Sequence, residues 1–171
     1  MRGRPERNEA VDFYWRYIDL VPGDDAISAL ERQLGEATSL LQSVSEEKST
    51  YRYRPGKWSM RQALSHVTDT ERSFCYRALW FGRGFTTALE GLPENEAAEA
   101  AQADRISWVA HVEEFRRVRL ATVALFQHMP EEAWSRSGVV SGNPISVRAL
   151  AFLTAGHAEH HLAIFRDRYL I

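Results

Sequence analysis

The sequence predicts an all-α fold, a four-helix bundle, from three observations. Four long segments carry apolar residues at the three- and four-residue spacing of amphipathic helices. Proline and glycine residues gather between these segments and break the pattern. No stretch alternates apolar and polar residues for more than a few positions, so helix on helix is the layer architecture that remains. The chain has 171 residues, 44% of them hydrophobic, which suits one buried core, and we expect a single domain over residues 1–171.

The first long helix is expected to begin after the breaker Pro22-Gly23. Asp24 or Asp25 can cap it, because an aspartate side chain accepts a hydrogen bond from the free N–H groups of a first helical turn. The apolar stripe that follows has helical spacing: Ile27, Leu30, Leu34, Ala37, Leu41 and Val44. A short apolar and aromatic segment, residues 11–21, precedes this helix.

The second helix is expected to start near Ser59, after the breaker Pro55-Gly56. Ser59 and Gln62 have the spacing of a capping box, in which each side chain bonds to the other residue's backbone N–H. The glycines of the run 82–84 end this helix. One side of it carries residues at helical spacing: Ala63, His66, Val67, Thr70 and Phe74.

The third helix is predicted from about Arg105 to Met129, and the fourth from a cap at Ser146 to about Tyr169. Residues 130–144, between them, include a run of turn-forming residues. Residues 85–104 are rich in alanine and glutamate and contain loop, a short helix or both, because periodicity does not decide between these. A segment of this length allows a connection that crosses the bundle.

Composition excludes several classes of function. With 21 basic and 23 acidic residues the net charge is −2, so no cationic field attracts nucleic acid or anionic lipid. The single cysteine, Cys75, cannot form an internal disulfide, which fits a reducing compartment. The charged first residues lack the apolar core of a signal peptide, and no stretch approaches the roughly 20 apolar residues that cross a bilayer. We therefore expect a cytoplasmic protein without a membrane or nucleic-acid partner.

Three histidines crowd into the last helix, in the run 156–161. His157 and His161 lie about 40° apart on the helix surface and one turn along, so both imidazoles can reach one ion. Their stripe is otherwise apolar, and a buried imidazole needs a partner. A divalent metal supplies one, and His66, on the apolar side of the second helix, is the candidate third ligand. Three ligands leave an open coordination position, typical of catalytic sites.

The spacing alone leaves two interpretations open, a metal site or histidines that are solvated or hydrogen-bonded. His160 either helps to hold a ligand or substrate or is an exposed helix residue. Asp69 is a candidate carboxylate ligand or hydrogen-bond acceptor, whereas Glu71 is expected to form salt links with nearby arginines. His111 and His128 are expected on the surface or at the rim of the bundle.

Other polar residues receive no chemical role. Cys75 follows His66 by nine residues, about 900° of helical rotation, and is expected to be a buried packing residue on nearly the opposite side of the helix. The third helix carries three arginines that follow the acidic pair Glu113 and Glu114, and this pattern predicts a solvated face with balanced charge: Arg116, Arg117 and Arg119.

Two segments resemble the signatures of the DinB-like superfamily. The first is RPGKWSMRQALSH at residues 54–66, followed by the run DTER from Asp69, and the second is HAEHHLA at residues 157–163. The segment 17–22 also resembles this family, so the likeness covers nearly the whole chain. It implies an up-down-down-up four-helix bundle with a long crossover between its second and third helices. It also implies a metal site of His66, His157 and His161, with His160 not a direct ligand.

The resemblance implies several possible activities. Characterised relatives include transferases of low-molecular-weight thiols, a mycothiol-dependent maleylpyruvate isomerase and the metal-binding domain of ergothioneine-pathway enzymes. Many other members carry only the name of metal-dependent hydrolases. We therefore expect a metal-dependent enzyme, with zinc, nickel or a similar divalent ion, that transfers a thiol cosubstrate to an electrophilic small molecule. The alternatives are a hydrolase that uses metal-bound hydroxide and a non-catalytic metal-binding module of a stress response. A homodimer is expected from the same resemblance.

Overall fold

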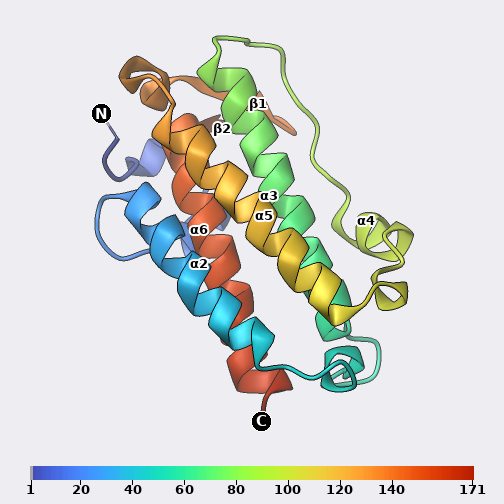
Figure 1. Ribbon diagram of the computed structural model, residues 1–171. Helices are drawn as coiled ribbons and strands as arrows, with labels where there is room; N and C mark the ends of the chain where they lie inside the picture. Colours follow the sequence, from blue (N-terminus) through green and yellow to red (C-terminus); the bar gives the residue numbers. More distant parts are fainter. Residues whose placement is uncertain (1) are drawn as a thin grey trace.

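The computed structural model describes residues 2–171, and these are mostly helical (Figure 1). Four long helices lie side by side: α2 (Ala26–Gln42), α3 (Met60–Gly82), α5 (Trp108–Gln127) and α6 (Val147–Ile164). Both α2 and α3 pack against α5 and against α6, so α2 and α3 lie diagonally opposite each other. The expected all-α architecture of four packed helices is confirmed.

The capping residues explain where the long helices begin. Asp25 accepts a hydrogen bond from the backbone N–H of Ile27, and Ser59 and Gln62 form the reciprocal capping box. The predicted start of the third helix at Arg105 is wrong. Ser107 caps α5 instead, because its hydroxyl can accept from a backbone N–H of the first turn and an arginine side chain cannot.

Two short helices complete the helical structure. Helix α1 (Asp12–Ile18) packs across α6, and α4 (Glu94–Ala100) packs on α3. Short 3₁₀ turns occur at Arg7–Glu9, Lys48–Thr50, Ala103–Arg105 and Glu131–Ser135, and a π-helical turn, Phe165–Tyr169, extends α6. In residues 2–171 no helix is long and apolar enough to cross a membrane.

The turn-rich stretch before α6 forms a small hairpin. Strand β1 (Ser137–Val140) pairs antiparallel with β2 (Asn143–Ser146). The two residues between the strands, Ser141 and Gly142, both have positive φ, as a tight two-residue hairpin turn requires. The sequence predicts this turn but not the strands, because four residues are too few to show alternation.

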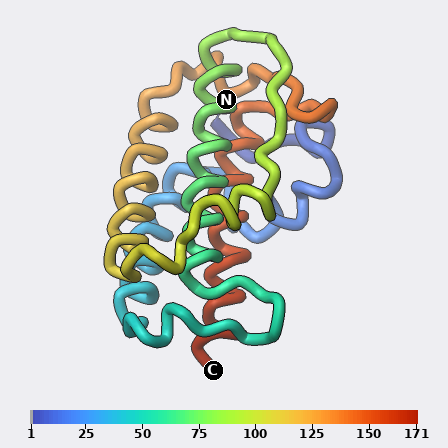
Figure 2. Tube along the Cα trace, turned by 90° about the vertical axis from the view of Figure 1, so that its right-hand side faces the viewer, coloured from blue at the N-terminus to red at the C-terminus, as the bar shows by residue number. Residues whose placement is uncertain are grey.

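The segment left open in the sequence, residues 85–104, belongs to a connection that runs back along the bundle. It leaves the end of α3, pairs briefly at Leu89 with Val140 and then forms α4. Figure 2 shows the green-to-yellow tube passing along α3 before it reaches the start of α5. This return brings α4 onto the middle of α3, next to the histidines described below.

The buried apolar residues form two clusters, one towards each end of the bundle. One cluster contains Phe74 and Ala155, and the other contains Val67 and Ala158. Between them each long helix contributes a buried polar residue to one layer: Gln33, Glu71, Arg119 and His157. The middle of this bundle is therefore polar, and its polar groups need partners.

Candidate metal centre

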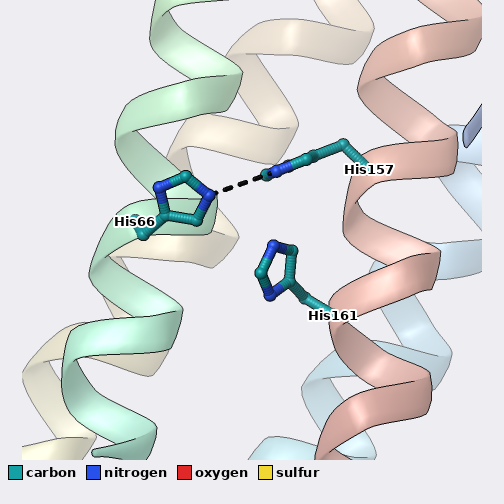
Figure 3. Close-up of side chains that lie close together, drawn as sticks. All are labelled: His66, His157 and His161. Carbon is teal, nitrogen blue, oxygen red and sulfur yellow. Dashed lines mark hydrogen bonds between the residues drawn. The ribbon is translucent and has the colours of Figure 1, made fainter. Parts of the chain in front are cut away.

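The three predicted ligand residues meet in the middle of the bundle. His66 extends from α3, and His157 and His161 extend from successive turns of α6 (Figure 3). One ring nitrogen of each lies within 4.8 Å of those of the other two. The Nε2 atoms of His66 and His157 are 3.2 Å apart. Residues 91 positions apart in the chain thus share one site.

The packing of α3 against α6 explains why the rings face one another. On α3 the neighbours of His66, Leu64 and Val67, lie in one apolar cluster together with Ala158 of α6. Burial of these side chains sets the rotation of both helices about their axes, because their apolar stripes must face the core. The imidazoles then project into the space between α3 and α6.

Aromatic side chains enclose the cluster. The Trp58 ring lies 4.9 Å from the His66 ring, and the Phe74 ring lies 5.9 Å from that of His157. Tyr17 of α1 packs edge-on against His157, with 5.4 Å between ring centroids. These rings remove much of the surrounding water, which strengthens electrostatic interactions inside the site.

Burial makes the three imidazoles neutral at neutral pH. Loss of solvent lowers the pKa of His157 well below its usual value and lowers that of His161 to about 3. Desolvation also lowers the pKa of His66, although the nearby carboxylates of Glu94 and Asp69 oppose this shift. Neutral imidazole is the form that binds a metal ion, so no proton has to be removed before binding.

The donor set fits a divalent transition metal. Metal–nitrogen bonds of 2.0–2.1 Å in a tetrahedral arrangement require ligand nitrogens about 3.3 Å apart. The 3.2 Å between the Nε2 atoms of His66 and His157 is close to this spacing. Two buried ring nitrogens that face each other so closely can form a hydrogen bond only if one of them carries the N–H of its neutral ring. If both present lone pairs, a shared cation satisfies both.

One further acidic residue lies at the site, and sequence reasoning missed it. Oε1 of Glu94, in α4, is 3.7 Å from Nε2 of His66, and the Glu94 side chain is 60% exposed. Asp69, the carboxylate considered from the sequence, is not part of the cluster and accepts a hydrogen bond from Arg72 at 2.9 Å. No local signal identifies Glu94, because only the return of the long connection brings α4 to α3.

The other histidines take different positions. His160 is half-buried, 5.3 Å from the Tyr17 ring and 5.2 Å from the His161 ring. His128 is exposed, as predicted. His111 is not at the surface: it is 1% exposed, and its Nε2 lies 2.9 Å from the carbonyl oxygen of Ala103. The turn at residues 103–105 covers it, which the sequence pattern of α5 alone does not reveal.

Glu71 and Arg119 correct a further expectation. Arg119 is fully buried and does not belong to a solvated face, unlike its neighbours Arg116 and Arg117. Its guanidinium donates two hydrogen bonds of 2.8 Å to the carboxylate of Glu71, which is 2% exposed. The predicted salt link of Glu71 is therefore present, but with an arginine 48 residues away and inside the core.

Cys75 lies apart from the histidine cluster. It is half-buried, and its Sγ is 3.2 Å from Oγ1 of Thr122. Burial raises the pKa of this thiol to about 12. The side chain is therefore a protonated packing group at neutral pH, and a protonated thiol is a poor nucleophile.

A comparison with known protein families identifies the family of this chain. A model of the DinB superfamily matches residues 29–165. The chain belongs to the DinB superfamily. A search of curated protein sequences found no match to this chain.

Several solved structures share the fold, YfiT and a maleylpyruvate isomerase among them. YfiT from Bacillus subtilis, described as a probable metal-dependent hydrolase with an unusual four-helix bundle topology, aligns with a TM-score of 0.74 at 16% identity, over 83% of this chain and 82% of its own. The mycothiol-dependent maleylpyruvate isomerase aligns with a TM-score of 0.66 at 16% identity, over 84% of this chain. This DinB-superfamily chain spans only 62% of that isomerase. At such identities the likeness concerns the fold.

Cavities reach the histidines of this DinB-superfamily chain from two directions. One, which we name the Arg77 cavity, has a volume of about 170 Å³ and is lined by His66, His157 and Arg77 among others. Another, the Trp58 cavity, has a volume of about 260 Å³ and is lined by Trp58 and His161. The same cluster of imidazoles is thus accessible from both cavities.

Proposed function

We propose that this chain is a metal-dependent enzyme that transfers a low-molecular-weight thiol to an electrophilic small molecule. His66, His157 and His161 would hold the ion, a divalent transition metal such as zinc or nickel. The observation that carries the proposal is a pair of cavities at one histidine cluster: the Arg77 cavity is lined by His66 and His157, and the Trp58 cavity is lined by His161. A reaction between two small molecules needs two binding places beside one centre.

The metal, when bound, supplies a Lewis acid that holds a thiol as its reactive thiolate at neutral pH. The protein's own residues position and shield this centre. The three imidazoles are neutral and face one another, and Oγ1 of Thr70 lies 3.4 Å from Nδ1 of His66. Trp58 and Phe74 cover the cluster and limit access of water. Cys75 lines neither cavity, so the sulfur has to come from a cosubstrate.

A hydrolase is the second candidate, because Glu94 favours it. An exposed carboxylate 3.7 Å from Nε2 of His66 lies where a general base could take a proton from an attacking water. The YfiT structure, described as a probable metal-dependent hydrolase, has the same fold. In a third reading the metal only links α3 to α6, and the chain is a non-catalytic module of a stress response.

The proposal includes four further expectations, two from the family resemblance (the helix order and the dimer) and two from composition (the single domain and the location). The helices have the up-down-down-up order, which the long return between α3 and α5 supports. Residues 1–171 form one domain. The chain forms a homodimer, which light scattering after gel filtration tests. The protein is cytoplasmic, where reducing conditions keep a thiol cosubstrate available.

The first experiment measures metal content by elemental mass spectrometry on untagged protein. We expect about one transition-metal ion per chain, lost in the His157→Ala/His161→Ala double variant. The control is His128→Ala, which removes an exposed imidazole outside the cluster. A metal-free protein that cannot be reconstituted would exclude both enzymatic readings.

The second experiment separates the enzymatic readings. Common bacterial thiols are mixed with chlorodinitrobenzene, and thiol loss is compared with hydrolysis of nitrophenyl esters. Thiol transfer predicts metal-dependent thiol loss that survives Glu94→Gln, whereas hydrolysis predicts ester cleavage that Glu94→Gln reduces by about 10²-fold or more. If no thiol is consumed faster than with the double variant, thiol transfer is wrong. The structural reading predicts neither reaction, together with a large fall in melting temperature when the metal is removed.

A further inference from the structure

Arg77 is a buried cation without a carboxylate partner. Its residue is 6% exposed, and its one hydrogen bond runs from an Nη atom to the carbonyl oxygen of Glu90 at 3.3 Å. The other buried arginines in the described part of the chain are paired: Arg61 with Glu46 and Arg119 with Glu71. Since this fold pairs its other buried guanidinium groups, the exception requires an explanation.

Leaving Arg77 unpaired is unfavourable for stability. A buried charge loses its hydration, and desolvation lowers the pKa of Arg77. Guanidinium nevertheless remains protonated in proteins, so the charge cannot be removed by loss of a proton. Departures of this kind from local pairing rules are expected at functional sites.

The helical phase of α3 directs Arg77 towards the histidines. His66, Thr70, Ser73 and Arg77 all line the Arg77 cavity, at the spacing of one helix face. Cζ of Arg77 lies 5.7 Å from the ring centroid of Phe74, so the side chain bends back towards the start of the helix, as helical side chains do.

One phenyl ring, that of Phe74, lies near both the cation and the metal-binding cluster. The Phe74 ring centroid lies 5.7 Å from Cζ of Arg77 and 5.9 Å from the ring centroid of His157. A small molecule that touches both Arg77 and the histidines therefore lies along this ring.

The charges around the cavity favour an anion. Arg16 of α1 also lines it, stacked 3.7 Å from the Phe13 ring centroid, and none of the described carboxylates pairs with it. Glu94 is the only acidic residue in the lining, and it lies beside His66. The lining thus contains two arginines and one carboxylate, and the positive charge of Arg77 has no carboxylate partner.

We propose that the Arg77 cavity binds a small carboxylate, whose charged end pairs with the Arg77 guanidinium and whose apolar body lies along Phe74 towards the three histidines. Carboxylate is planar and accepts two parallel hydrogen bonds from one guanidinium. The volume of about 170 Å³ equals roughly six water molecules at about 30 Å³ each, which suits a small molecule. The inference names the substrate class of the proposed function, and the reaction of the bound molecule rests on that function.

The test is calorimetric titration of metal-free, chelator-treated protein with acetate, propionate, benzoate and phenylacetate, each compared with its neutral amide. Chelation removes the possibility that a carboxylate binds to the metal. We expect at least one acid to bind about tenfold or more tightly than its amide, the effect of a charge-assisted hydrogen bond. Arg77→Gln should abolish that preference, and Arg77→Lys should keep part of it. The control, Arg83→Gln, removes an exposed arginine at the end of the same helix, outside the cavity, and should retain it.

Equal binding of every acid and amide by the wild-type protein would overturn the inference without any variant. A preference that survives Arg77→Gln in a protein that folds normally would overturn it as well. Methylphosphonate binding more tightly than every carboxylate would refute the assignment to carboxylates. Arg77-dependent binding in a protein that neither takes up metal nor consumes thiol would leave this inference standing and remove the proposed function. Metal-dependent thiol transfer without acid preference would do the reverse.

Discussion

Glu71→Leu is expected to destabilise the chain far more than a surface substitution. Glu71 is 2% exposed and accepts two hydrogen bonds of 2.8 Å from Arg119, which is fully buried. Removal of the carboxylate leaves the Arg119 guanidinium hydrogen-bonded to the side chain of Gln33, at 2.9 Å, and weakly to the Leu30 carbonyl, with the Phe115 ring 5.3 Å away. Breaking one side of a buried ion pair costs about 3–5 kcal/mol.

The expected loss is directly measurable by thermal or urea unfolding followed by circular dichroism. For a chain of this size each 1 kcal/mol shifts the melting temperature by about 2–4 °C, so a fall of about 6–20 °C is expected. Glu113→Gln is the control, because Glu113 pairs with arginines on the exposed face of α5. That variant should change the free energy of unfolding by less than about 0.5 kcal/mol.

The double variant Glu71→Leu/Arg119→Met tests the reasoning itself. It removes both charges and fills the space with apolar groups, so it should be more stable than Glu71→Leu alone. Arg119 also donates to the side chain of Gln33, which in turn donates hydrogen bonds to the carbonyl oxygen of Ala155 and to Glu159, on either side of His157. Because Glu71→Leu disturbs Arg119, it should weaken metal binding too. A single variant that loses less than about 1 kcal/mol, or a double variant less stable than Glu71→Leu, would refute this account.

Three further predictions concern α6 and the thiol. Gly156→Ala should cost about 3 kcal/mol in thermal unfolding, because a Cβ there would lie 2.0 Å from the carbonyl oxygen of Tyr17; an unchanged melting temperature would contradict the close approach of α1. Cys75, with its pKa raised to about 12, should react with iodoacetamide at pH 8 much more slowly in the folded chain than in urea, and equal rates would show an accessible thiolate. In metal-free protein the lowered pKa values of His157 and His161 mean that the unfolded chain takes up protons first as the pH falls below about 6.5. The free energy of unfolding should then fall by up to about 1.4 kcal/mol per pH unit for each histidine. The His157→Ala/His161→Ala variant should show a shallower fall, and an equal slope would rule out these histidines as its cause.

Helix boundaries show how far local sequence reasoning extends. The caps at Asp25, Ser59 and Ser146 were predictable because the capping hydrogen bonds form within a few residues. Helix α5 begins three residues after the predicted Arg105, because Arg105 belongs to a separate 3₁₀ turn and Ser107 caps the helix. The hairpin before α6 was recognisable only by its turn.

Burial of polar residues was harder to predict. Arg119 and His111 share a helix with exposed charges, and the pattern of α5 does not distinguish them from their neighbours. Each is buried by an element distant in the sequence: Glu71 of α3 pairs with Arg119, and the turn containing Ala103 covers His111. A polar side chain becomes a core residue only when its partner is present.

By itself the sequence determined the four long helices and the close pair His157 and His161, because helical periodicity and a four-residue spacing are properties of one local segment. The tertiary structure decided what these elements meet. It brought His66 within 3.2 Å of His157, placed Glu94 beside them and left Arg77 in a cavity without a carboxylate. A sequence pattern indicates which face of a helix is buried, but only the docking of distant elements decides which side chains become neighbours there.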